Sequence, residues 1–248
     1  MAKQKGLVKF EGTIDGLTFY RNSEGHYVRM AGGVSKTRIM NDPAFARTRE
    51  NINEFGKNAK ASKFLRDTAG IMVGRAKDSR TSNRLMPLFN KIKNMDDISD
   101  RGQRKISIGI AHPEGKNLLR NFDFNKNAQL RNILKHALVL DTATGTLDLL
   151  QLIPNLHVSF PQGATHCSMS MGSMNIDFEE EEGQLVQSNV ENFPLDLIPI
   201  DISLTATPPG GTGETFFLIL IEFFQEVNGK QYPLNNGAFN VLNILEII

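Results

Sequence analysis

The segment Thr215–Val227 restricts the possible folds of this chain more than any other stretch. It reads TFFLILIEFFQEV, it is rich in β-branched and aromatic residues, and glycines precede and follow it. Such a run predicts a central strand with both faces buried. A membrane-spanning helix needs about 20 consecutive apolar residues, whereas the unbroken apolar part here runs only from Phe216 to Ile221. We therefore expect this segment in the middle of a sheet.

Length and composition describe an ordinary globular chain. The 248 residues are 40% hydrophobic and 22% charged, which fits one large or two modest domains. The first residues are basic but no apolar stretch follows them, so we expect no classical signal peptide and no membrane span. This places the protein in the cytoplasm by default, or in an exported assembly. The single cysteine, Cys167, excludes an internal disulfide framework and cannot alone form a zinc site.

The small net charge of +1 hides a strong division of charge along the chain. Residues 1–140 hold 27 Lys and Arg against 13 Asp and Glu, a balance of +14. Residues 141–248 hold one basic residue, Lys230, against 14 acidic ones, a balance of −13. Such asymmetry indicates that one half meets something of opposite sign. Either the basic half binds an external polyanion, or the two halves meet each other, within one chain or between neighbouring copies.

The N-terminal segment, residues 1–30, is cut by glycines into short extended pieces that predict β-hairpins. It has few apolar residues to cover its faces, and a two-stranded unit is marginal alone. We therefore expect it to dock on another part of the chain or to be donated to a neighbouring molecule. The candidate assembly residues are Leu7, Val8, Phe10, Ile14, Leu17, Phe19, Tyr20 and Tyr27.

Residues 31–103 predict a basic helical region. Asp42-Pro43 is typical of a helix start, and Gly56 is expected to end that helix. A second helix is expected over 58–73, with Leu65 and Met72 on its apolar stripe. A third begins near Ser79, and Pro87 predicts a kink in it or a later start.

These helices carry the candidate basic surface. Its members are Arg47, Arg49, Lys57, Lys60, Lys63 and Arg66. Three interpretations stand: a solvated face, a surface that contacts nucleic-acid phosphates, or a surface for an acidic protein, including the acidic half of this protein.

Residues 104–248 are expected to form the β-rich part of the chain, with 118–124 ambiguous and 129–136 either helical turns or another strand. Arg104–Ile110 alternates like a strand, and at least seven further candidates follow at spacings of roughly 8 to 12 residues, without a helix-length segment between them. The predicted fold class is α+β, with a C-terminal antiparallel β-sandwich, Ig-like or jelly-roll-like. The predicted division is 1–30, 31–103 and 104–248.

No constellation of residues predicts catalysis. The adjacent His166 and Cys167 would point to opposite faces of a strand, and the glycine-rich stretch 208–213 lacks the lysine of a phosphate loop. We expect no catalytic residue, metal, cofactor or small-molecule ligand. The run Glu179, Glu180, Glu181 and Glu182 is the candidate acidic surface, because its mutual repulsion favours contact with a basic surface. Met169, Met171 and Met174 are interpreted as core residues rather than a partner groove.

Three phrases of the sequence carry a resemblance. The opening GLVKFEGTIDGLTFY, the segment NDPAFARTREN and the ending that contains QEVNGKQYPL are similar to a family of uncharacterised Bacteroidota proteins. The similarity covers nearly the whole chain, and the N-terminal pattern has a loose likeness to phage-type structural subunits. The resemblance implies no established activity and no catalytic residues.

These observations favour a non-enzymatic structural or self-assembling subunit. It would form homo-oligomers or filaments through complementary basic and acidic surfaces, since head-to-tail contacts generate rings or open filaments. The alternative is a nucleic-acid-binding module that uses the basic helices. A sugar-binding sandwich has little support, because Trp is absent and only three Tyr are present.

Overall fold

The computed structural model describes residues 2–76 and 78–248, without the side chains of 235 and 236. The described chain combines helices with antiparallel sheets, which confirms the mixed α and β class. It divides into two compact units that meet between Asn51 and Ile52, inside one helix. The division into 1–30, 31–103 and 104–248 that the sequence suggested stays a prediction.

The first unit contains a four-stranded antiparallel sheet in the order β1-β4-β3-β2. Its elements are β1 (Ala2–Lys3), β2 (Gly12–Ile14), β3 (Leu17–Asn22), β4 (Gly25–Met30), α1 (Lys36–Asn41) and the 3-10 turn η1 (Pro43–Phe45). A two-residue turn joins β2 to β3, with φ of 45° at Asp15 and 75° at Gly16. Positive φ at both positions is the geometry that matches the twist of a tight hairpin, so this turn fixes the register of the two strands.

The helices of the chain are more numerous than expected. They are α2 (Ala46–Thr68), α3 (Gly70–Arg75), α4 (Thr81–Lys93), α5 (Ile106–Ala111), α6 (Pro113–Leu119), α7 (Leu130–Ile133) and α8 (Pro154–His157). The predicted stop at Gly56 is wrong: α2 continues through it, because Gly56 is not among the glycines with the positive φ of a helix end. Helix α4 likewise contains Pro87 in its interior.

The strand predicted over Arg104–Ile110 is also wrong, because this stretch forms α5. Ile106 and Ile110 are both buried, and a spacing of four residues places them on one helical face. Gly109 lies against α4 so closely that a Cβ there would be 2.0 Å from the Ile92 carbonyl oxygen. The isoleucines thus satisfy a helical period as well as the period of a strand.

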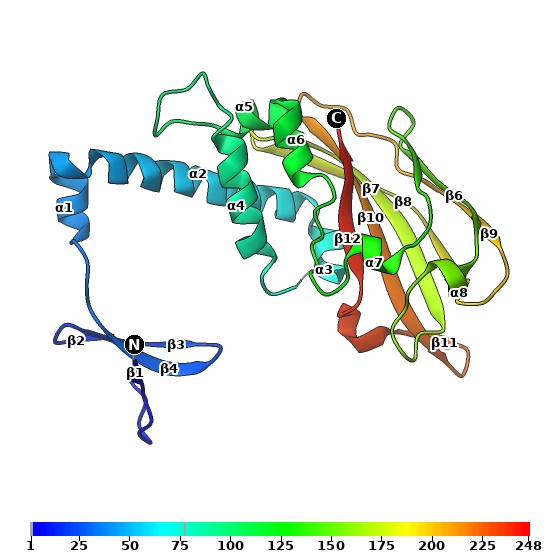
Figure 1. Cartoon of the computed structure of the whole chain (residues 1–248), viewed down its shortest axis with the longest axis horizontal. Coiled ribbons are helices and arrows are strands. Elements are labelled where there is room, and N and C mark those ends of the chain that lie inside the picture. Colours follow the sequence, from blue (N-terminus) through cyan, green and yellow to red (C-terminus); the bar gives the residue numbers. More distant parts are fainter. Residues whose placement is uncertain (1, 77) are drawn as a thin grey trace. The chain divides into compact units, whose positions relative to one another are not determined.

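The remaining strands form two antiparallel sheets. They are β5 (Val139–Asp141), β6 (Thr146–Leu152), β7 (His166–Asp177), β8 (Glu182–Pro194), β9 (Ile200–Thr205), β10 (Glu214–Val227), β11 (Lys230–Pro233) and β12 (Val241–Ile247), with a 3-10 turn η2 (Leu234–Gly237). In one sheet, β10 pairs with β7 on one side and with β11 and β12 on the other, and β8 lies beyond β7. The other sheet has the order β5-β6-β9. The predicted central position of Thr215–Val227 is confirmed (Figure 1).

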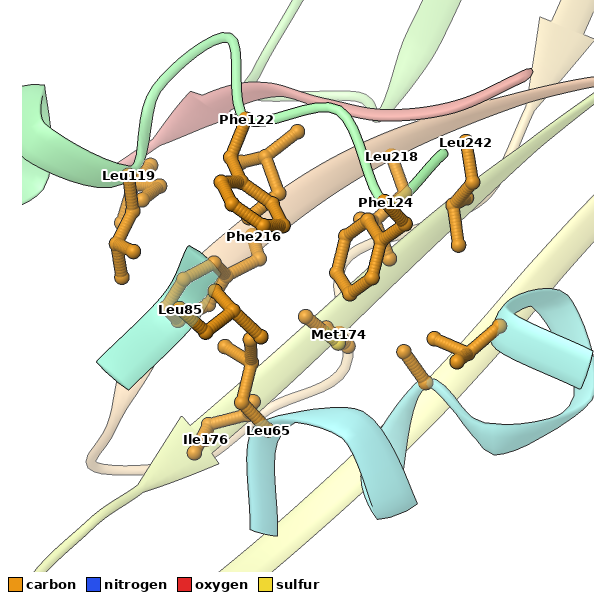
Figure 2. Packing of buried hydrophobic residues seen from close by; sticks show 14 of the residues in the cluster. Leu65, Leu85, Leu119, Phe122, Phe124, Met174, Ile176, Phe216, Leu218 and Leu242 are labelled. Atoms are coloured by element: carbon orange, nitrogen blue, oxygen red, sulfur yellow. The ribbon is translucent and has the colours of Figure 1, made fainter. Parts of the chain in front are cut away.

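Strand β10 is buried on both faces, and its side chains alternate between two separate cores. Phe216, Leu218 and Leu220 face the helices, where they join Leu65 of α2 and Phe124 of the segment after α6 (Figure 2). On the other face, a second apolar cluster joins β10 and β7 to β6 and β9. Its members include Phe217, Ile219, Ile221, Cys167, Met169, Met171, Leu147, Leu149, Ile202 and Leu204. Met174 lies in the first core and Met169 and Met171 in the second, which confirms all three as core residues.

A buried ion pair ties α2 to α4. Glu54 and Lys93 are both buried, and the Lys93 ammonium donates to Glu54 Oε2 while the Gly102 N–H donates to Oε1 at 2.7 Å. Burial by itself raises the pKa of Glu54, but the hydrogen bonds from Lys93 and Gly102 outweigh it and hold the pKa below its usual value. The carboxylate is therefore ionised and anchors the segment after α4.

Replacing Lys93 by Met leaves the Glu54 carboxylate buried without its cation. We expect a loss of about 3–5 kcal/mol in the free energy of unfolding, the usual cost of breaking a buried pair from one side. Urea denaturation measures it. The matched control is Lys91→Met on the exposed side of the same helix, with an expected change within about 0.5 kcal/mol. Equal effects of the two substitutions would contradict the pairing.

Asp96 holds the backbone of the segment that follows α4. Its Oδ1 accepts the N–H groups of Ile98 and Ser99, and its Oδ2 accepts the N–H of Lys105 at 2.8 Å. Burial raises the pKa of Asp96, but these backbone hydrogen bonds overcome it and lower the pKa from 3.8 to about 2.

The lowered pKa of Asp96 sets a pH dependence. The folded form holds its proton less tightly than the unfolded form, so the stabilisation is complete above pH 3.8 and is lost as the pH falls toward 2. We expect Asp96→Asn to cost about 2 kcal/mol at pH 6 and almost nothing relative to the parent at pH 2. Denaturation curves of both proteins across this range provide the measurement. A constant difference at every pH would refute the assignment.

Candidate assembly surfaces

The N-terminal sheet has one apolar face. Directly paired residues lie on the same face of a sheet, as do alternate residues along a strand. The pairs Ile14 with Leu17, and Leu17 with Met30, therefore share a face with the pair of Phe19 and Val28. The ring of Phe10 lies 5.8 Å from that of Phe19. We call this set the apolar sheet face: Phe10, Ile14, Leu17, Phe19, Val28 and Met30.

The opposite face of the same sheet is polar and aromatic. The hydroxyls of Thr13 and Thr18 lie 3.3 Å apart. Tyr20 and Tyr27 stack with their ring centroids 6.0 Å apart, and the Arg29 guanidinium lies 5.7 Å from the Tyr20 ring centre. The predicted assembly residues Tyr20 and Tyr27 are thus separated from Leu17 and Phe19.

The predicted residues Leu7 and Val8 lie in the loop between β1 and β2, and both are exposed. Gln4 closes this loop, because its Nε2 donates to the Phe10 carbonyl and its Oε1 accepts the Phe10 N–H at 3.0 Å. The loop therefore presents Leu7 and Val8 beyond the sheet itself.

No described residue of the first unit covers the apolar sheet face. Among the described residues 2–51, none is buried. Met30 is 80% exposed, Ile14 55% and Phe10 51%. A small sheet gains stability by burying an apolar face, and contiguous exposed apolar surface marks an interaction site. Val28 and Met30 were missed in the sequence, although the hairpin that pairs Asn22 with Gly25 sets the β3–β4 register that places them there.

The candidate basic surface is not a free patch. Each of its six residues has a partner within the chain. Arg47 pairs with Glu50, Arg49 donates to the carbonyls of Ile39 and Asp42, Lys57 donates to Gln103, Lys60 pairs with Glu181, Lys63 pairs with Asp67, and Arg66 donates to the Ser62 carbonyl. These contacts compete with any phosphate for the same donors.

The candidate acidic surface is the turn between β7 and β8, and it meets the helices. Glu179 accepts hydrogen bonds from the Lys105 ammonium and from Ser107 Oγ, the latter at 2.9 Å. These bonds, led by that from Lys105, lower the pKa of Glu179. Glu181 lies 3.8 Å from Lys60, whereas Glu180 and Glu182 are exposed. Part of the acidic turn thus faces part of the basic surface within the second unit.

The charge division is partly neutralised inside the second unit. Five ion pairs in the described part of the chain join a base of residues 57–120 to a carboxylate of residues 179–246. They are Lys60–Glu181, Arg75–Glu222, Lys105–Glu179, Lys116–Glu214 and Arg120–Glu246. Of the alternatives that the sequence left open, contact between the two halves of one chain is therefore present.

A hollow of about 520 Å³ lies between α2, the start of α5 and the β7–β8 turn. Phe64 and Phe178 contribute apolar surface, and several lysines surround them. Two of these lysines, Lys60 and Lys105, already pair with Glu181 and Glu179. The hollow therefore offers mixed charge rather than a cationic pocket.

The reactive side chains of Cys167 and His166 lie in different surroundings, although the two residues are adjacent. In the described part of the chain, no three His, Cys, Asp or Glu side chains come together as metal ligands. Cys167 is buried in the second core, and its burial, together with the charge of Glu222, raises the pKa of its thiol far above the ordinary range. His166 turns to the other face, 3.5 Å from Glu226. The two neighbours cannot act together.

Comparisons with known proteins give no relative. No protein-family model matches this chain, and no match was found among the curated proteins or the solved structures. In the part of the chain that the structure describes, no helix combines the length and apolar character needed to cross a bilayer.

The burial of Cys167 predicts that the native protein does not react with thiol reagents. We expect no labelling by an aromatic disulfide reagent in buffer, and one thiol per chain after denaturation, because the thiolate is both inaccessible and disfavoured. Absorbance of the released thiolate gives the measurement. Labelling in buffer at the rate of a free peptide thiol would contradict this burial.

Proposed function

We propose that this protein is a non-enzymatic structural subunit that assembles with further copies of itself through its N-terminal sheet. The observation that carries the proposal is the apolar sheet face that its own unit leaves uncovered, since the described residues 2–51 of that unit include none that is buried. A sheet with one apolar and one polar face is organised to pack its apolar face against a partner.

Covering this face has a favourable free energy. Removing Ile14, Leu17 and Met30 from water contributes about 1–2 kcal/mol for each side chain, since all three are partly exposed. The polar face needs no partner of the same kind, because its threonines and tyrosines contact each other across the strands. Association would therefore use one face of the sheet.

The charge distribution favours a second copy as the partner. Residues 1–51 hold nine Lys and Arg against five Asp and Glu, a balance of +4, whereas residues 141–248 have a balance of −13. Opposite charge on two different surfaces of one chain supports contact between successive copies. Such contacts are heterologous, and they build rings or filaments.

We further infer that the two sheets of the second unit form an antiparallel sandwich of the Ig-like or jelly-roll-like kind. The second core between them supports this. So does Asn189 on β8, whose amide donates to the Ser203 carbonyl and accepts the Thr205 N–H at 3.1 Å. Its side chain thereby links β8 to β9 at the corner between the sheets.

A nucleic-acid-binding module is the weaker proposal. The six residues of the candidate basic surface already have partners within the chain. Phosphate contacts would have to displace them.

The proposal is tested by the mass of the full-length protein in solution. We expect an oligomer by light scattering, and we expect Ile14→Asp to shift the mass toward the monomer, because a carboxylate on the apolar sheet face is costly to desolvate. The matched control is Thr13→Asp, the preceding residue of β2 on the opposite face, which should leave the mass unchanged.

Three outcomes bear on the proposal. A monomeric parent at every concentration would overturn it, and so would an oligomer that Ile14→Asp does not weaken. Retardation of DNA that falls steeply with salt, from a monomeric parent, would instead favour the nucleic-acid module.

A further inference from the structure

A second exposed apolar surface lies at one end of the three-stranded sheet. Leu150 of β6, Leu156 of α8, and Leu197 and Ile198 of the β8–β9 connection are each 61–65% exposed. We call these four residues the apolar end patch. Large side chains exposed together on neighbouring segments mark an interaction surface rather than scattered surface residues.

Hydrogen bonds hold the segments of this patch together. The Asn155 N–H donates to the Asp196 carbonyl at 2.8 Å, and the Asn155 amide donates to the Leu195 carbonyl at 3.2 Å. These bonds join α8 to the β8–β9 connection. The patch is therefore built on a connected framework and not on one isolated loop.

A bulge in β6 explains why Leu150 lies outside. The register with β9 shifts between Leu149 and Leu152, which are both buried, and Gln151 between them has a φ of 57°. Asp201 Oδ1 accepts the Gln151 N–H at 2.7 Å. A residue with positive φ other than glycine is strained. Proteins keep such a residue at a bulge where the bulge changes the direction of the neighbouring side chains.

The two apolar surfaces lie in parts of the chain with opposite net charge, +4 for residues 1–51 and −13 for residues 141–248. Asp196 and Asp201 adjoin the apolar end patch, and residues 141–229 contain no Lys or Arg. In the described structure, Lys135 adjoins α8 of the apolar end patch, because its backbone N–H donates to the His157 carbonyl. On the apolar sheet face, alternation places Arg21 in line with Leu17 and Phe19. Its cross-strand partner His26 lies 3.9 Å from Glu11, so the excess of bases belongs to the unit as a whole.

We infer that the apolar end patch of one copy receives the apolar sheet face of the next copy. This inference rests on the proposed function and adds the acceptor surface to it. Apolar side chains form the centre of each surface, and the opposite net charges of the two parts of the chain favour their contact. The acidic residues beside the apolar end patch disfavour anionic membrane surfaces as the occupant.

Cysteine cross-linking between two copies tests the inference directly. Full-length Ile14→Cys and Leu197→Cys proteins carry different tags, are mixed, and are treated with a short bis-maleimide. Because Cys167 is buried, the engineered thiols are the accessible ones. We expect a covalent dimer that carries both tags. The matched control pairs Ile14→Cys with Asp97→Cys, an exposed position after α4, and should give a several-fold lower yield.

The outcomes separate the inference from the proposed function. An oligomer by light scattering without a link above the Asp97 control overturns the acceptor and leaves self-assembly intact. A monomer without a link overturns both. A chain carrying both cysteines that links only within itself, while the mixture gives no dimer, overturns the second copy as the occupant.

Discussion

The burial of β10 on both faces is the constraint on which the second unit depends. A strand whose neighbouring side chains point to opposite sides, and are all large and apolar, has to be covered twice. Phe216 and Leu218 are covered by helices, and Phe217 and Ile219 by strands β6 and β9 together with their own sheet. Neither layer could be removed without exposing half of the longest apolar strand in the chain. The order of layers therefore follows from a single segment.

The division of charge follows the same layering. Helices that cover the first core come from the basic half of the sequence, and the strands beneath them come from the acidic half. Pairs such as Arg75–Glu222 at 3.2 Å and Lys116–Glu214 at 2.5 Å lie where the two layers meet. Each exposed pair adds little free energy. As a set they join the helical layer to the strands beneath it. The net charge of +1 belongs to the whole chain, the first unit included.

The sequence predicts elements well where a single period dominates. Strand β10 was found because its flanking glycines and its apolar run agree. Helix α5 was missed because Ile106, Ile108 and Ile110 fit both periods, and only the close approach of Gly109 to α4 decides between them. The apolar sheet face could likewise be predicted only in part. The exposed segment was recognisable from its lack of apolar residues, but its two faces depend on a register that pairs Leu17 with Met30.

The N-terminal sheet shows how a unit can be specified without a core of its own. Its tight turn at Asp15-Gly16 and its cross-strand pairs fix the backbone locally, whereas the apolar sheet face leaves most of the hydrophobic free energy to be gained on contact. In the proposed assembly, folding of this unit is linked to binding, so its stability rises with the concentration of its partner. On that proposal, a chain that carries both the sheet and its acceptor couples its own ordering to the number of copies around it.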